Sequence, residues 1–229
     1  MTTPPRFGAP GAGPWVQRWL SPPRHAVYLA AAANDPERAL ALYEWNAQLS
    51  AALLRDLAHV EVGLRNAYDT ALVGQWPGPP HWTSNGEQVF APLFRTKSGH
   101  RVDVNSKPRE SLRRAVASAG GASVPPGKVI AELTFGFWRY LSSAAHEKTL
   151  WVRCLYRSFP PGTDRRDVDG PVGRVHNLRN RVAHHEPLLQ TNVAARLADL
   201  VAIATFLDAD LGRHLTATTT VTGLLETRP

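Results

Sequence analysis

The chain has 229 residues, of which 43% are hydrophobic and 20% charged, as expected of a globular protein with one main domain. Its single cysteine, Cys154, excludes an intrachain disulfide and a cysteine-based zinc site, and fits a reducing compartment. The net charge of +7 favours a polyanionic partner such as RNA, DNA or anionic lipid.

Targeting and membrane signals are not found in the sequence. The segment MTTPPRFGAPGAGPW has no apolar region of the kind a signal peptide needs. No run of about 18 uncharged apolar residues occurs, so no membrane span is predicted. We therefore expect a cytoplasmic protein with three parts: an irregular N-terminal segment over 1–22, a helical domain over 23–213, and an irregular tail over 214–229.

The first helices follow from proline positions and apolar spacing. A short helix is predicted from about Pro23. Asp35 and Pro36 then form a helix start, with an aspartate N-cap and proline at the first helical position. Apolar residues recur at spacings of three and four up to Gly74, which predicts one long helix.

A basic segment over 95–114 follows a loop rich in proline and glycine. Its second half is predicted to be a helix that starts near Ser106. A solvated basic face is one interpretation, and a track for the RNA backbone is the other. The candidate RNA-binding residues are Arg95, Lys97, Arg101, Lys107, Arg109, Arg113 and Arg114.

The remaining helices are predicted over KVIAELTFGFWRYL from about Lys128, and over HEKTLWVRCLYRSF up to Pro160. Pro171 is expected to open the next helix, and Pro187 to end or bend it because proline removes an amide donor. The last helix is expected from about Asn192. No segment alternates convincingly at period two, so we predict an all-α fold, an antiparallel helical bundle with long loops.

The predicted helix after Pro171 carries RVHNLRNRVAHHEPLL over 174–189. A metal site is one interpretation, but His184 and His185 are adjacent and point about 100° apart on a helix. The string HHEPLLQ also lacks the second histidine of an HExxH motif. A second interpretation is a cationic face near a helix C-terminus, where positive charge is favoured. That interpretation does not account for Asn180 within the run.

A third interpretation is phosphate chemistry. His176, Asn180 and His184 lie four residues apart and share one helix face. Arg179 supplies a planar fork for phosphate oxygens, and a histidine can transfer a proton near neutral pH. Together they could cleave RNA without a metal, with the 2′-OH of the substrate as nucleophile.

The string RNRVAH over 179–184 resembles the R-x4–6-H signature of the HEPN superfamily. The wider string LRNRVAHHEPL is similar to the Abi-like (abortive phage infection) branch, as are HVEVGLRNAY over 59–68 and AELTFGFWRYL over 131–141, in the same order. The resemblance covers about residues 20–210. It implies an all-α bundle of HEPN type and a metal-independent endoribonuclease without a cofactor.

The resemblance also implies roles and partners. Arg179 and His184 would be the catalytic pair, with Asn180 as the adjacent polar residue. The expected partners are RNA, a second copy of the chain in a homodimer and an antitoxin protein or RNA, in phage defence or a toxin–antitoxin pair. Other interpretations are a non-catalytic RNA-binding or regulatory HEPN protein and a helical interaction module. Supporting candidates from the motif and from the first long helix are His176, Arg181, His185, Glu186, Glu61, Arg65 and Asn66.

Glu61 falls on the apolar stripe of the long helix, where an unpaired charge is costly. One interpretation is a local pair with Arg65. The other is that Glu61, Arg65 or Asn66 supports the motif helix.

Overall fold

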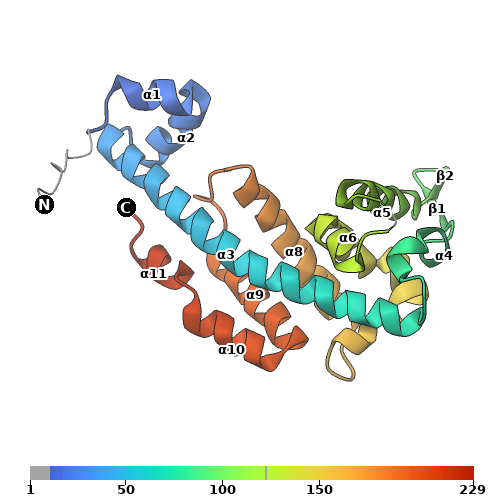
Figure 1. The fold of residues 1–229 in the computed structure, drawn as a ribbon. Helices are drawn as coiled ribbons and strands as arrows, with labels where there is room; N and C mark the ends of the chain where they lie inside the picture. Colours follow the sequence, from blue (N-terminus) through green and yellow to red (C-terminus); the bar gives the residue numbers. More distant parts are fainter. Residues whose placement is uncertain (1–10, 122) are drawn as a thin grey trace, which may run out of the picture. The chain divides into compact units, whose positions relative to one another are not determined.

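Helices dominate the chain, as the spacing of its apolar residues predicts (Figure 1). The computed structural model describes residues 11–121 and 123–229. The chain divides into two units, and the division falls inside helices. The first unit comprises the chain up to Arg55, Asn180–Ala194 and Thr219–Pro229. The second unit comprises Asp56–Arg179 and Ala195–Thr218, so the segment expected as one helical domain over 23–213 contributes to both units.

The longest helix, α3 (Pro36–Gln75), confirms the prediction for this region and contributes to both units. It begins where the Asp35 carboxylate accepts the amide of Glu37 at 2.9 Å and that of Arg38 at 3.2 Å. The predicted apolar stripe is buried in the second half of α3, where Leu57, Leu64 and Tyr68 are at most 1% exposed. In the first half the prediction is wrong: Leu54 of the stripe is 48% exposed, and the buried face instead contains Leu49 and Leu53.

The first unit also contains helices at both ends of the described chain, α1 (Pro14–Leu20), α2 (Pro22–Ala31) and α11 (Val221–Glu226). The prediction of irregular segments over 1–22 and 214–229 is therefore wrong for 14–20, 214–218 and 221–226, whereas residues 1–10 lie outside the described residues. Tertiary contacts stabilise the C-terminal helix. The indole of Trp45 donates to the carbonyl of Leu224 at 2.6 Å, and Arg228 donates to that of Leu189 at 3.2 Å. Such contacts leave no periodic signal in the sequence.

The second unit contains most of the chain. After α3 its helices and strands are η1 (Trp82–Ser84), α4 (Gly86–Val89), β1 (Phe94–Lys97), β2 (His100–Asp103), α5 (Ser106–Ala119), α6 (Pro126–Glu132), α7 (Phe135–Leu141), η2 (Ala144–His146), η3 (Glu147–Trp151), η4 (Leu155–Ser158), α8 (Arg165–Ala183), α9 (Val193–Leu207) and α10 (Ala209–Thr218). Of these, α8 continues into the first unit at Asn180, and α9 begins there.

A hairpin of β1 and β2 lies within the basic segment and corrects the prediction of an all-α fold. The strands pair antiparallel, with Phe94 opposite Asp103 and Lys97 opposite His100. Ser98 and Gly99 form the turn, with φ of 50° and 79°. Most side chains of the hairpin are exposed, so its sequence has no apolar–polar alternation from which a strand could be predicted.

Two predicted helices are interrupted. The one expected from Lys128 is split into α6 and α7, because Leu133 and Thr134 adopt extended backbone angles. The one expected over 146–159 is wrong: this region forms short 3-10 and π turns.

Aspartate caps shift two further boundaries. The motif helix α8 begins at Arg165 and not at Pro171, which lies inside it, because the Asp164 carboxylate accepts the amide of Arg166 at 2.7 Å. The predicted last helix is divided at Asp208, whose carboxylate accepts the amide of Asp210 at 2.7 Å and so begins α10.

Candidate functional site

The motif lies on α8 and on the turn that follows it, and it spans the division between the two units. Arg179 and His176 belong to the second unit, whereas Asn180 and His184 belong to the first. Val175, Leu178 and Val182 are buried on the apolar stripe of α8, at most 3% exposed. His176, Arg179 and Asn180 lie beside that stripe and are partly exposed.

Arg179 contacts Glu61 of α3. Its Nε lies 3.9 Å from Oε2 of Glu61, and the two side chains are 37% and 24% exposed. Burial raises the pKa of Glu61, and the positive charges of Arg179 and Arg65 partly oppose that rise. Arg65 is thus an electrostatic neighbour of Glu61, and its buried Nε has no hydrogen-bond partner within the described part of the chain. The third α3 candidate, Asn66, is exposed.

His176 lies against α7. The ring of Phe135 meets its imidazole edge to face, with centroids 5.8 Å apart. A Cβ at Gly136 would come within 3.2 Å of Nε2 of His176, so glycine permits this close approach. Burial lowers the pKa of His176, and the charges of Arg139 and Arg179 lower it further. The imidazole is therefore neutral at pH 7.

The sequence interpretation missed Arg139, because the segment AELTFGFWRYL was identified only as a predicted helix and as part of the resemblance. Arg139 lies near His176, and its Nη2 is 3.8 Å from Oδ1 of Asp169 on α8. A Cβ at Gly173 would be 3.4 Å from the same guanidinium nitrogen. Three cations of the second unit, Arg65, Arg139 and Arg179, thus lie close to Glu61 or His176, a group that we call the α8 cluster.

His184 and His185 form the capping turn of α8, within the first unit. The amide of Glu186 donates to the carbonyl of Arg181 at 2.9 Å, and that of His185 donates to Val182 at 3.1 Å. His185 has a φ of 54°, the left-handed conformation that usually favours glycine. The helix therefore ends at Ala183, before the position expected from Pro187, and both histidine side chains are exposed.

Arg181 stabilises this turn. Its guanidinium donates to Oγ1 of Thr191 at 2.6 Å, to the carbonyl of Pro187 at 2.8 Å and to Glu186 at 3.1 Å. These bonds use three of the five N–H donors of the guanidinium. Arg181 and Glu186 thus stabilise the turn that presents His184.

The basic segment over 95–114 is only partly an exposed cationic surface. Arg95, Arg101 and Lys107 are exposed, and Lys97 lies in β1. Arg113 and Arg114 are 64% and 77% exposed, but both donate to Glu110, at 2.7 and 2.8 Å. We name the exposed cations Arg95, Arg101, Lys107, Arg113 and Arg114 the α5 surface.

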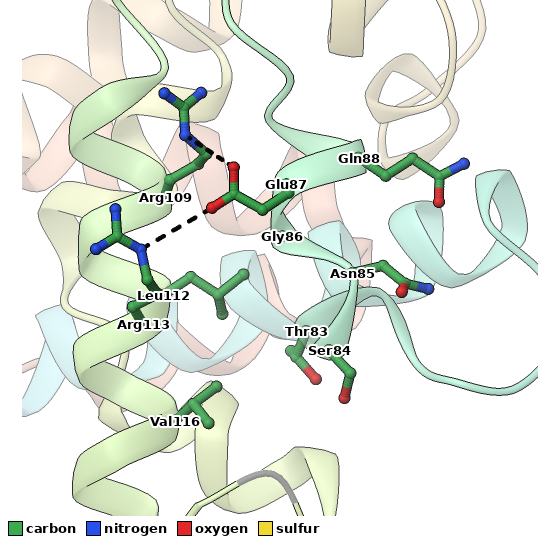
Figure 2. Close-up of a pocket in the computed structure, with 10 residues that line it drawn as sticks. All are labelled: Thr83, Ser84, Asn85, Gly86, Glu87, Gln88, Arg109, Leu112, Arg113 and Val116. Carbon is green, nitrogen blue, oxygen red and sulfur yellow. Dashed lines mark ion pairs between the residues drawn. The ribbon is translucent and has the colours of Figure 1, made fainter.

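Arg109 does not belong to that surface and corrects the prediction for it. Its side chain is 12% exposed, pairs with Asp103 and donates to the carbonyl of Phe90 at 2.6 Å. Its Nε also lies 3.4 Å from Glu87, whose carboxylate is 4.0 Å from Nε of Arg113, as the dashed lines of Figure 2 show.

A pocket of about 450 Å³, which no sequence pattern predicts, lies beside these ion pairs. It is lined by η1, α4 and α5, with Leu112 and Val116 on its apolar side (Figure 2). The two arginines that reach the pocket are paired with carboxylates, Arg109 with Asp103 and Arg113 with Glu110. Glu87 lies between them, so the pocket is a poor cationic site for a phosphate.

Within the described residues, no group of three or more His, Cys, Asp or Glu side chains is placed to hold a metal ion. No helix among them combines the length and the apolar character needed to cross a membrane. No protein-family model, curated protein or solved structure matches the chain.

Proposed function

We propose that the protein is an endoribonuclease of the HEPN type that cleaves RNA by attack of the substrate's own 2′-OH. The observation that carries the proposal is the setting of Arg179. This half-exposed arginine is held by the carboxylate of Glu61, on another helix, beside a histidine that is neutral at pH 7. A fixed cation next to a proton acceptor is what phosphoryl chemistry without a metal needs.

Arg179 binds the scissile phosphate in this proposal. Its contact with Glu61 is long and is made through Nε, 3.9 Å from Oε2, so the two terminal nitrogens of the guanidinium are the atoms proposed to bind the phosphate. A guanidinium fork matches two phosphate oxygens and stabilises the extra negative charge of the transition state. Glu61 and Arg65 position Arg179 and do not react.

His184 transfers the proton. A base removes the proton of the 2′-OH, the 2′-oxygen attacks phosphorus, and the bond from phosphorus to the 5′-oxygen breaks. The 5′-oxygen leaves with a proton from an acid, so the products carry a 2′,3′-cyclic phosphate and a 5′-OH. The capping turn presents His184 to solvent one residue beyond α8. The backbone amide of His184 donates to the backbone carbonyl of Asn180 at 2.9 Å.

His176 supports the same step from within the α8 cluster. Its lowered pKa keeps a proton-accepting nitrogen at neutral pH, next to Arg139 and Arg179. A phosphate bound there would raise that pKa and so help the imidazole to hold a proton during the reaction.

The resemblance of the motif and its two accompanying segments to Abi-like proteins extends the proposal. The protein would act in the cytoplasm as a homodimer, as a phage-defence or toxin-type effector, silenced by an antitoxin protein or RNA. The exposed cations of the α5 surface would follow the RNA backbone. The second candidate function is non-catalytic RNA binding, favoured by that surface, which would attract RNA whether or not the motif cleaves it.

RNA cleavage in EDTA tests the proposal. The wild type, Arg179→Ala, His184→Ala and His176→Ala are compared under single turnover, with Arg166→Ala as the control because it replaces an exposed arginine elsewhere on α8. Loss of a charge-stabilising donor or of an acid–base group costs about 10²-fold or more. We expect that loss for Arg179→Ala and His184→Ala and a smaller one for His176→Ala.

The outcomes separate the candidates. Cleavage that persists in both Arg179→Ala and His184→Ala would refute the assignment of the site. Binding without cleavage by the wild type would favour the non-catalytic function. An absence of RNA binding would leave a helical interaction module.

A further inference from the structure

A pocket of about 290 Å³ lies within the first unit, at the turn that carries the motif histidines. Its lining comes from three places in the sequence: α2, the first half of α3, and the end of α8 with its capping turn. The residues that define its character are Arg24, Tyr43, Ser50, Leu54, Val182 and His185. Its volume is at the low end for ligand pockets and suits one small ring system.

Two buried polar residues lie in the wall of the pocket. Ser50 is 8% exposed, and its hydroxyl has no hydrogen-bond partner within the described residues. A buried hydroxyl without a partner is costly, and it can both donate and accept. Asn46 is 4% exposed, and its side-chain oxygen accepts the amide of Leu188 at 2.7 Å, which fixes the amide group. The pocket thus offers fixed polar groups within an apolar wall.

A row of aromatic rings leads to the pocket from α1. Trp15 and Trp19 are stacked, with centroids 5.8 Å apart and 19° between the planes. Trp19 meets the edge of Tyr43 at 5.0 Å, and Tyr43 lines the pocket. Trp19 is nevertheless 53% exposed. An exposed ring beside a pocket that fits a ring is the arrangement by which proteins bind the unstacked bases of single strands.

The lining of the pocket also includes a cation, Arg24. Arg24 lines the pocket and donates through Nη1 to the carbonyl of His185 at 3.0 Å. The remaining donors of this half-buried guanidinium can meet a phosphate, while the apolar pocket accepts the base attached to it.

We propose that this pocket holds one nucleobase of a single-stranded RNA and that Trp19 stacks on a neighbouring base. The pocket is then a specificity site, because the Ser50 hydroxyl and the Asn46 amide hydrogen-bond to the edge of the bound base. This inference rests on the proposed ribonuclease function, because His185 lines the pocket and directly follows His184, the proposed proton-transfer residue.

The test measures binding in a chain that carries Arg179→Ala, so that cleavage does not interfere. Anisotropy of labelled single-stranded nonamers of A, U and C gives three affinities, and a nonamer with one abasic site gives a fourth. We expect the best and worst bases to differ about tenfold, the scale of one base contact. Ala51→Phe fills the pocket from its lining and should reduce the best affinity to the level of the worst.

Three further variants complete the design. Ala41→Phe adds the same ring at another exposed position of α3, outside the pocket, and should leave the preference intact. Ser50→Ala removes only the hydroxyl and should narrow the preference several-fold, which keeps the test valid if the larger Ala51→Phe side chain disturbs folding. Trp19→Ala should weaken all RNAs by about tenfold, because stacking is tolerant of sequence.

The proposal that the pocket binds a base would be overturned by equal affinities for the three nonamers. It would also be overturned by a base preference that survives both Ala51→Phe and Ser50→Ala. If the wild type cleaves RNA while that preference survives both substitutions, the base-binding role of the pocket is refuted and the ribonuclease function is supported. If the wild type does not cleave RNA but Ala51→Phe abolishes the base preference, the base-binding role of the pocket is supported and the ribonuclease function is refuted. An absence of RNA binding would overturn both.

Discussion

The α8 cluster and the α5 surface are both rich in arginine, but they differ in how their charge is compensated. In the α8 cluster, three arginines lie around Glu61 and His176, and the contact of Arg179 with the Glu61 carboxylate is 3.9 Å long. On the α5 surface, Glu110 accepts close hydrogen bonds from both Arg113 and Arg114. Counting cations in the sequence therefore overstates the charge available on α5 and understates that on α8.

The largest expected effect separates geometry from charge in the two regions. Arg179→Lys keeps the charge and removes the planar fork, so we expect RNA cleavage to slow by about tenfold or more. Arg113→Lys and Arg114→Lys should each slow it less than about twofold, because a point charge serves equally on an exposed backbone track. Single-turnover cleavage at one salt concentration measures all three. Equal losses in the two regions would remove the distinction between them.

The second prediction compares partly exposed His176 of the α8 cluster with buried His146 of η2. His146 lies near Arg95 and is 1% exposed, and burial lowers its pKa to about 4 from 6.5. The folded pKa lies below the unfolded one, so the stability that this group contributes is present above pH 6.5 and is lost as the pH falls towards 4. The loss is about 3 kcal/mol between those limits.

Urea unfolding at several pH values tests this expectation. His146→Phe keeps a ring against Tyr140, whose centroid is 5.0 Å away, and should flatten the dependence of the unfolding free energy between pH 4 and 6.5. A smaller acid loss should remain, because the pKa of His176 is also lowered. An unchanged slope in His146→Phe would show that His146 is not the group responsible.

The third prediction concerns two arginines of α5. Arg109→Ala removes the partner of Asp103 and a bond to the carbonyl of Phe90, at a site where the arginine is 12% exposed. We expect a loss of about 2 kcal/mol in the free energy of unfolding, the cost of leaving partly buried polar groups without their partner. Arg114→Ala replaces a side chain that is 77% exposed and should change stability little. Similar losses in the two variants would contradict the division of this segment into structural and exposed cations.

The sequence predicted the features that local chemistry sets. Asp35 and Pro36 located the start of α3, and its apolar spacing predicted the buried face of the second half of the helix. In the first half, Leu54 of the same stripe is exposed, because the partners of this part of the helix come from distant segments of the chain. The placement of Glu61 on that buried face predicted that it has a cationic partner, because a half-buried carboxylate without one is costly. The alternative of a contact with the motif helix is the one seen, at Arg179.

What could not be predicted depends on contacts distant in sequence. The hairpin has exposed side chains on most of its length, and α11 is stabilised by Trp45, so neither leaves a periodic pattern. The pocket in the first unit joins α2, α3 and the turn after α8, which only the fold brings together. Pro171 was read as a helix start because its position inside a helix depends on the cap at Asp164.

The smallest expected effect compares two left-handed residues, one in the turn after α8 and one in the hairpin of the basic segment. His185 and Ser98 have φ of 54° and 50°, which a side chain disfavours. His185→Gly should raise the free energy of unfolding by about 0.5–1 kcal/mol, because this turn ends a buried helix and forms only in the folded chain. Ser98→Gly should raise it less, since an exposed two-stranded hairpin can open without global unfolding. Urea unfolding of both variants measures the difference, and an equal gain would show that the hairpin unfolds together with the rest of its unit.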